Sequence, residues 1–208
     1  MKIASVTLFC NESFRLTQWI QYFSEYKEDI YMQVIVNNGK YEDSSLLQSA
    51  FPSATVLFSE TSNMIASYNL AIKYILNNSD ADTILQITND LRVEKGGLKQ
   101  LYNILYKENQ FGMISPILLK KDSYVVENYG AEIDFKNMLF RHVCRNKLYN
   151  EVQPDIVYRT GLPGGCFLTK REVYEKIGLQ DEILNMYSDE VDTGIKCANI
   201  GYKLLSTK

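Results

Sequence analysis

Short apolar runs alternate with longer amphipathic segments along the first half of the chain, and this alternation limits the folds that it can adopt. Residues 3–9 are mostly apolar, as is typical of a strand covered on both faces of a sheet. From 13 to 27, apolar residues recur at helical spacing instead. Further strands are expected at 31–36, 55–58, 83–88 and 112–116, and further helices at 63–76 and 95–107. This order predicts an α/β fold with a mainly parallel, Rossmann-like sheet and helices on both faces.

The second half of the chain has a less regular pattern. Between 123 and 158, aromatic, amide and charged residues follow no clear period, so irregular strands and loops are expected there. A loop at 161–165, a strand at 166–169 and a short helix at 170–177 come next, and a last helix ends at Gly201. A length of 208 residues without repeat or linker fits a single domain, in which we distinguish the halves 1–116 and 117–208.

Composition excludes several classes of protein. The net charge is -3 and the basic residues are dispersed, which argues against a nucleic-acid-binding surface. The cysteines lie far apart without paired spacing, so we expect reduced thiols in a cytoplasmic protein, with neither a zinc site nor a disulfide framework. No apolar run approaches the roughly 18 residues of a membrane span, and we expect a soluble protein.

Polar residues follow three of the expected parallel strands directly. They form the triplets Cys10-Asn11-Glu12, Asn37-Asn38-Gly39 and Thr88-Asn89-Asp90. Ligands of open parallel sheets bind beyond the carboxyl ends of the strands, so the triplets should converge on one edge. The sequence therefore predicts a site rich in amide and carboxylate groups, without a glycine-rich phosphate loop.

An ordered set of motifs carries a family resemblance over nearly the whole chain. Its members are Asn11-Glu12, Val36-Asn37-Asn38-Gly39, Asn63-x5-Asn69, Asp90, Gly164-Gly165-Cys166-Phe167-Leu168, Asp189-Glu190-x-Asp192 and Gly201-Tyr202. In this order the chain resembles family 2 glycosyltransferases of the GT-A (nucleotide-diphospho-sugar transferase) fold, in the rhamnosyltransferase-like branch. The resemblance implies a metal-assisted, inverting transfer of a sugar from a nucleotide-diphosphate donor to a glycan or lipid-linked hydroxyl. It also implies a role in polysaccharide biosynthesis in the cytoplasm, with peripheral contact at the inner face of the membrane.

The metal and nucleotide residues follow from the resemblance. Asp90 matches the last carboxylate of the family's DxD-type motif, where it would hold Mn²⁺ or Mg²⁺ against the diphosphate. Thr88 departs from the family's acid at the first position of that motif, and Asn37 stands where relatives often carry an acid that binds the base. The expected nucleotide-binding residues are Phe9, Cys10, Asn11, Glu12, Asn37, Asn38, Asn63, Asn69 and Asn89.

The remaining site residues lie in the second half. The loop Gly164-Gly165, with Cys166, resembles the family segment beside donor sugar and acceptor, where absent side chains permit close approach. Asp189 and Glu190 are the candidate general bases; the register favours Glu190, while Asp189 serves if the loop shifts by one residue. Relatives commonly continue with a further strand after Gly-Tyr-Lys, so we expect the acceptor-side half to be short at its C-terminal end.

Simpler interpretations stand beside each of these. Asn37-Asn38-Gly39 and Asn89-Asp90 can be plain turns, Asn69 a polar helix residue, and acids at a helix start partners of the macrodipole. His142, the only histidine, is expected to be a surface or packing residue. Two other functions also remain: a non-catalytic nucleotide- or glycan-binding domain, and a sugar nucleotidyltransferase, which needs a basic loop for which 11–16 offers only Arg15.

Overall fold

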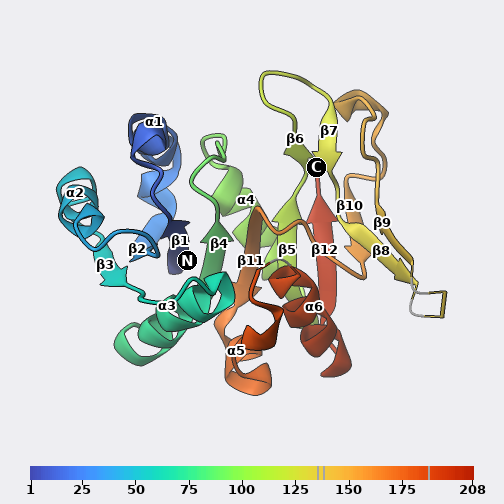
Figure 1. Cartoon of the computed structure of the whole chain (residues 1–208). Coiled ribbons are helices and arrows are strands. Elements are labelled where there is room, and N and C mark those ends of the chain that lie inside the picture. Colours follow the sequence, from blue (N-terminus) through green and yellow to red (C-terminus); the bar gives the residue numbers. More distant parts are fainter. Residues whose placement is uncertain (135, 138, 187) are drawn as a thin grey trace.

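The computed structural model describes all residues except 135, 138 and 187 and shows a layered α/β domain (Figure 1). Its main sheet has the order β10-β12-β5-β11-β4-β1-β2-β3. The strands of this sheet are β1 (Ile3–Phe9), β2 (Ile30–Asn37), β3 (Thr55–Phe58), β4 (Thr83–Ile87), β5 (Phe111–Pro116), β10 (Ile156–Arg159), β11 (Cys166–Lys170) and β12 (Lys203–Thr207). Strands β3, β2, β1, β4, β5 and β12 run in one direction, while β11 and β10 oppose their neighbours.

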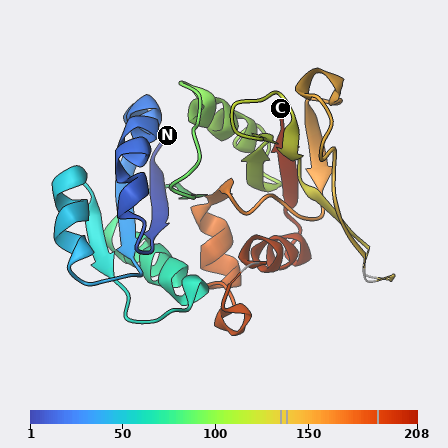
Figure 2. The ribbon, with the colours of Figure 1, turned by 45° about the horizontal axis from the view of Figure 1, so that its top comes forward.

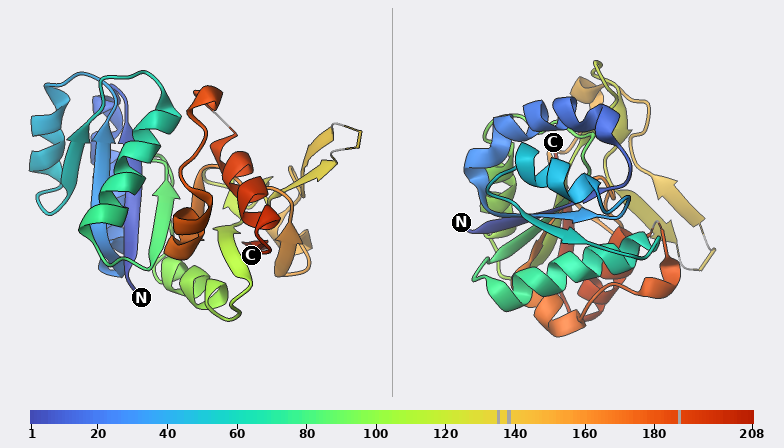
Figure 3. Two further views of the ribbon diagram at one scale, coloured as in Figure 1. Left: turned by 90° about the horizontal axis from the view of Figure 1, so that it is seen from below. Right: turned by 60° about the vertical axis from the view of Figure 1, so that its left-hand side comes forward.

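Helices cover both faces of this sheet. They are α1 (Leu16–Tyr26), α2 (Asp43–Ala50), α3 (Met64–Asn78), α4 (Gly97–Leu105), α5 (Arg171–Ile177) and α6 (Asp189–Asn199). Helices α1, α2 and α4 pack on one face, and α3, α5 and α6 on the other (Figure 3). The predicted mainly parallel sheet with helices on both faces is therefore confirmed.

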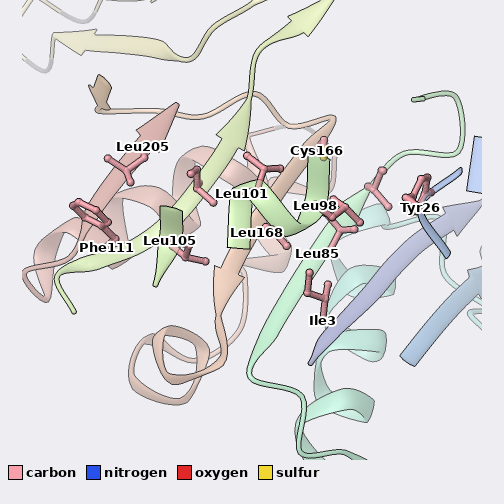
Figure 4. Close-up of a cluster of buried hydrophobic side chains, with 12 residues drawn as sticks. Ile3, Tyr26, Leu85, Leu98, Leu101, Leu105, Phe111, Cys166, Leu168 and Leu205 are labelled. Carbon is pink, nitrogen blue, oxygen red and sulfur yellow. The ribbon is translucent and has the colours of Figure 1, made fainter. Parts of the chain in front are cut away.

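Side chains of β1 alternate between the two faces, as its buried pattern requires. Ala4, Val6 and Leu8 pack under α3 with Ile72 and other residues of that helix. Ile3 lies on the opposite face, in the cluster that α4 covers through its leucines (Figure 4). Both faces of β1 are buried, so the strand is mostly apolar, and its two polar residues, Ser5 and Thr7, are buried as well.

The second half also contains short ribbons and turns. They are β6 (Leu118–Leu119) with β7 (Val126–Asn128), β8 (Ala131–Asp134) with β9 (Leu139–His142), and the 3-10 turns η3 (Tyr149–Glu151) and η4 (Glu182–Leu184). The 3-10 turns η1 (Ser13–Arg15) and η2 (Lys27–Asp29) lie in the first half. The β8–β9 hairpin projects from the body (Figure 2) and carries His142 on its exposed strand β9, edge-on to Phe140. His142 is thus the surface residue that the sequence predicts.

Two elements escape the sequence patterns, and both have a physical reason. Helix α2 buries only Leu47, so it offers almost no apolar period. Strand β12 follows Gly201, whose φ of 90° confirms the left-handed helix end, and pairs with β5 far away in the sequence. A strand therefore follows Gly201-Tyr202 in this chain, and the expectation of a short C-terminal end in the acceptor-side half stays a prediction.

The cysteines are free thiols, with Cys166 and Cys197 buried and Cys10 exposed. Among the residues that the structure describes, no helix is long and apolar enough to cross a membrane.

Candidate functional site

The ends of β1 and β2 are joined by backbone and amide hydrogen bonds. The Asn38 backbone N–H donates to the Phe9 carbonyl at 2.8 Å, and the Lys40 N–H donates to Asn11 Oδ1 at 3.1 Å. A Cβ at Gly39 would lie 2.7 Å from Asn11 Oδ1, so this approach requires glycine. The first two polar triplets therefore form one connected edge, with Cys10 and Asn11 exposed on it.

The end of β4 joins the same edge through side chains. Asn89 Nδ2 donates to Glu12 Oε2 at 2.5 Å. Arg15 Nη1 lies 3.3 Å from Asp90 Oδ2 and 3.5 Å from Glu12 Oε1. All three triplets after β1, β2 and β4 thus lie together, as expected for the ligand edge of a parallel sheet.

The side chains of Asn37 and Asn38 form hydrogen bonds within the turn and to neighbouring residues. Asn37 is buried; its Nδ2 donates to the Lys40 carbonyl at 2.7 Å and to Ser44 Oγ at 2.9 Å, and its Oδ1 accepts from Gly39. Asn38 Nδ2 donates to the Thr61 carbonyl and to Ser67 Oγ. Their contacts favour the plain-turn interpretation of this motif over direct recognition of a base by Asn37.

Asn63 and Asn69 attach the segment before α6 to helix α3. Asn63 Oδ1 caps α3 by accepting from the Ala66 N–H at 2.9 Å, and its Nδ2 donates to the Glu182 carbonyl at 2.7 Å. Asn69 is buried and exchanges two hydrogen bonds with the backbone of Gln180, at 2.9 and 3.0 Å. Through these contacts both amides hold the segment before α6 in place against α3. Their role in nucleotide binding stays a prediction.

The glycine loop lies between the β4 end and α6. The Thr88 N–H donates to the Gly165 carbonyl at 3.0 Å, while a Cβ at Gly164 would lie 3.0 Å from Glu190 Oε2. The antiparallel direction of β11 brings this loop to the ligand edge, because β11 starts where β4 ends. Cys166, the next residue, turns its thiol into the core under α4 (Figure 4), where burial raises its pKa to about 12.

Asp189 and Glu190 form a half-buried carboxyl pair at the start of α6. Burial, followed by the charge of Asp189, raises the pKa of Glu190 to about 8. Burial also raises the pKa of Asp189, against the effect of a hydrogen bond from Glu190. The pair can therefore hold a proton near neutral pH, as a group that exchanges protons with a substrate must.

Tyr68 of α3 is a buried residue whose pKa depends on the acids of the site. Its pKa is raised by burial and then by the charges of Asp189, Glu190 and Asp90. The charges of the carboxyl pair and of Asp90 thus all act on one buried phenol.

Three further residues of this site were not singled out as site residues from sequence: Arg15, Tyr68 and Gln86. Arg15 faces two carboxylates, and Tyr68 looked like an ordinary core residue on an apolar helix face. Gln86 did leave a signal, because it is a polar residue inside the otherwise apolar strand end Ile84-Leu85-Gln86-Ile87.

The residues around Asp90 fit a divalent cation that takes most of its ligands from phosphate. Asp90 is exposed, and its Oδ1 accepts from Thr88 Oγ1 at 2.8 Å while Oδ2 faces Arg15. No group of three His, Cys, Asp or Glu side chains suited to a metal occurs among the described residues. One carboxylate with substrate phosphates is a usual arrangement for Mg²⁺, so Asp90 would be the protein ligand of such an ion.

Comparison with known proteins decides the fold. No family model matches the sequence. The chain aligns over its full length with GalNAc-T7, solved with UDP, GalNAc and Mn²⁺ (TM-score 0.75, 15% identity, 42% of that chain). It also aligns over 98% of its length with the mannosyltransferase PcManGT from Pyrobaculum calidifontis, solved with GDP-Man and Mn²⁺ (TM-score 0.67, 15% identity, 53% of that chain). TarS from S. aureus aligns over 99% (TM-score 0.65, 14% identity, 58% of that chain).

The chain has the GT-A fold of the glycosyltransferases. The fold implied by its motifs is therefore confirmed. In sequence it is 25% identical over 129 residues to the low-salt glycan biosynthesis hexosyltransferase Agl10 of Haloferax volcanii, an alignment that covers 60% of this chain and 39% of Agl10. This GT-A chain spans only about two fifths to three fifths of the length of these proteins.

Proposed function

We propose that this GT-A domain is an inverting glycosyltransferase that moves a sugar from a nucleotide-diphosphate donor to a hydroxyl of a glycan or lipid-linked acceptor. The observation that carries the proposal is the arrangement of acids about the glycine loop. Gly165 contacts the turn that holds Asp90, and Gly164 contacts Glu190. An acid for the leaving diphosphate and an acid for the acceptor thus flank the same dipeptide.

The likeness to proteins of known activity supports this proposal. Agl10 is a hexosyltransferase, and two of the structural neighbours were solved with Mn²⁺ together with UDP or GDP-Man. In our assignment, residues 1–116 bind the nucleotide and 117–208 face the acceptor. We place the reaction in the cytoplasm, at the inner face of the membrane when the acceptor is lipid-linked.

Each residue has a distinct task in the proposed reaction. Glu190, in its ionised form, takes the proton of the acceptor hydroxyl while that oxygen attacks the anomeric carbon. The bond from the anomeric carbon to the diphosphate breaks on the opposite side, so the configuration inverts and the nucleotide diphosphate leaves. A divalent ion held by Asp90 would supply Lewis-acid stabilisation of that leaving group. Gly164 and Gly165 leave room for donor sugar and acceptor beside Glu190.

Calorimetric titration with UDP-, dTDP- and GDP-sugars, each with and without Mn²⁺, tests donor binding. We expect Mn²⁺-dependent binding of at least one donor. The variant Asp90→Ala should lose this dependence, with affinity in Mn²⁺ lower by about tenfold or more, or about 1.4 kcal/mol. Asp155→Ala, which removes an exposed carboxylate beside β10, is the matched control. Absence of metal-dependent binding with every donor contradicts the proposal.

A donor-hydrolysis assay separates the proposal from its two alternatives. A non-catalytic nucleotide- or glycan-binding domain would bind a donor without releasing nucleotide diphosphate above the level of Glu190→Gln. A sugar nucleotidyltransferase would release pyrophosphate from a nucleoside triphosphate and a sugar phosphate. The second alternative has little support at the site, because Arg15 of the 11–16 segment faces Glu12 and Asp90.

A further inference from the structure

A buried hydrogen-bond network connects strand β4 to the start of α6. Gln86 of β4 is 1% exposed. Its Nε2 donates to Asp189 Oδ2 at 3.4 Å, and its Oε1 accepts from the Tyr174 hydroxyl at 2.6 Å and from Gln180 Nε2 at 3.1 Å. The network therefore includes a carboxylate of the candidate site but none of its exposed residues.

The same network also holds the backbone of α6. Thr193 Oγ1 donates to the Asp189 carbonyl at 2.7 Å and accepts from Gln180 Nε2 at 3.1 Å. The Gln180 N–H in turn donates to Asn69 Oδ1 of α3. Hydrogen bonds thus connect strand β4 and helices α3, α5 and α6 to Asp189, the first residue of the carboxyl pair.

Two donors on one side determine how the Gln86 amide is oriented. Because Tyr174 and Gln180 both donate to Oε1, the NH₂ group must point away from them, and it faces Asp189. An NH₂ group can only donate, so it favours an acceptor oxygen on Asp189. Leaving these groups unpaired in the interior would cost about 1–3 kcal/mol each, so the amide has little freedom to turn.

The other groups that face the carboxyl pair do not oppose this arrangement. Tyr68 of α3 and Tyr174 of α5 are buried phenols whose pKa values burial raises, so both are neutral. On α6 itself, Asp192 is paired with Lys196 at 2.7 Å.

We propose that Gln86 is a positioning residue that holds Asp189 as the ionised member of the pair, so that Glu190 is the member that exchanges a proton with the acceptor. The proposal rests on the proposed glycosyltransferase function and deepens it. It also assigns two tasks to one strand, because Gln86 lies four residues before Asp90. Strand β4 would then set the place of the leaving-group acid and of the helix that carries the base.

The variant Gln86→Met tests this inference, because methionine keeps the volume and removes both hydrogen-bonding groups. Thr83→Val is the matched control: Thr83 is buried on the same strand, and its hydroxyl bonds Tyr106 at the other end of β4. The pKa of Asp189, followed through its carboxyl ¹³C resonance by NMR, should rise by about one unit or more in Gln86→Met and stay unchanged in Thr83→Val. Turnover should fall about tenfold or more at unchanged donor Kd, with a shifted pH profile.

A wild-type pKa for Asp189 in Gln86→Met, with turnover no lower than in Thr83→Val, overturns the inference. If Gln86→Met does not fold, Tyr174→Phe releases one of the two donors on Oε1, and a smaller pKa rise at Asp189 is expected; no rise overturns the inference. The NMR titration needs no substrate. A wild-type protein without transferase activity therefore refutes the proposed function, and the carboxyl titration separately tests the role of Gln86 in fixing Asp189.

Discussion

At the scale of single residues, burial raises the pKa values of the two adjacent carboxyls Asp189 and Glu190. Glu190 keeps its proton to about pH 8, since it is buried beside the charge of Asp189. An ionised Glu190 is therefore uncommon at neutral pH in the free protein. A base with this property becomes active as the pH rises, so kcat/KM should increase with pH and level off above about 8.

The variant Glu190→Gln should raise the thermal stability of the protein at alkaline pH. Between pH 4.5 and about 8 the folded protein retains a proton on Glu190 that the unfolded chain has released. The stability that this group contributes is complete below pH 4.5 and is lost as the pH rises through 8. Glutamine does not titrate, so thermal unfolding should show a Tm gain at pH 8.5 that is much smaller at pH 5.

The control for that measurement is Glu42→Gln, which changes an exposed carboxyl just before α2. It should alter stability by less than about 0.5 kcal/mol at both pH values. Equal Tm changes of Glu190→Gln at pH 5 and pH 8.5 would contradict the raised pKa of Glu190.

At the scale of elements, the antiparallel strand β11 decides where the glycine loop lies. It inserts between β4 and β5 and starts at the ligand edge, so the loop before it contacts both Thr88 and Glu190. A parallel strand in this position would have brought its other end to that edge. The direction of one strand therefore places the loop between the two acids.

Gly164→Ala should impair catalysis with little effect on folding. Its added methyl would lie 3.0 Å from Glu190 Oε2, so the carboxylate must move. The carboxylate would have to shift by a few tenths of an ångström. Since a displacement of about 1 Å can reduce rates about 100-fold, we expect kcat/KM to fall by up to about 10-fold. In Gly97→Ala, the control, the methyl meets only Val93 Cγ1 at 3.3 Å, and activity should be preserved. Equal activity of both variants would show that the loop does not approach the reacting groups.

At the scale of the whole molecule, the site depends on contacts between distant parts of the chain. Helix α3 belongs to the nucleotide half, yet Asn63 and Asn69 hold the backbone at 180 and 182 in the acceptor-side half. Figure 3 shows this segment beside the start of α3. The two halves of the sequence are thus joined next to the carboxyl pair.

Asn69→Ala separates a positioning role from nucleotide binding. Without the Asn69 amide, the backbone N–H and carbonyl of Gln180 lose their hydrogen-bond partner. The free energy of unfolding should then fall by about 1–3 kcal/mol, which corresponds to a Tm decrease of about 3–10 °C. Hydrogen exchange at 180–186 should become faster, while the Kd for nucleotide alone changes less than about twofold. Asn78→Ala, at the other end of α3, is the control. A large loss of nucleotide affinity with unchanged exchange would favour the nucleotide-binding role instead.

The sequence by itself determined most elements of the first half, the order of the motifs and the polar strand ends, because each depends on neighbours a few residues apart. Strand β1 and helix α3 were predicted nearly to their ends, and the convergence of the triplets followed from parallel strands sharing an edge. Only the tertiary structure decided the antiparallel insertion of β11 and the network of Gln86. These depend on partners up to about a hundred residues away, such as Gln86 with Asp189, and local periodicity carries no information about such pairs.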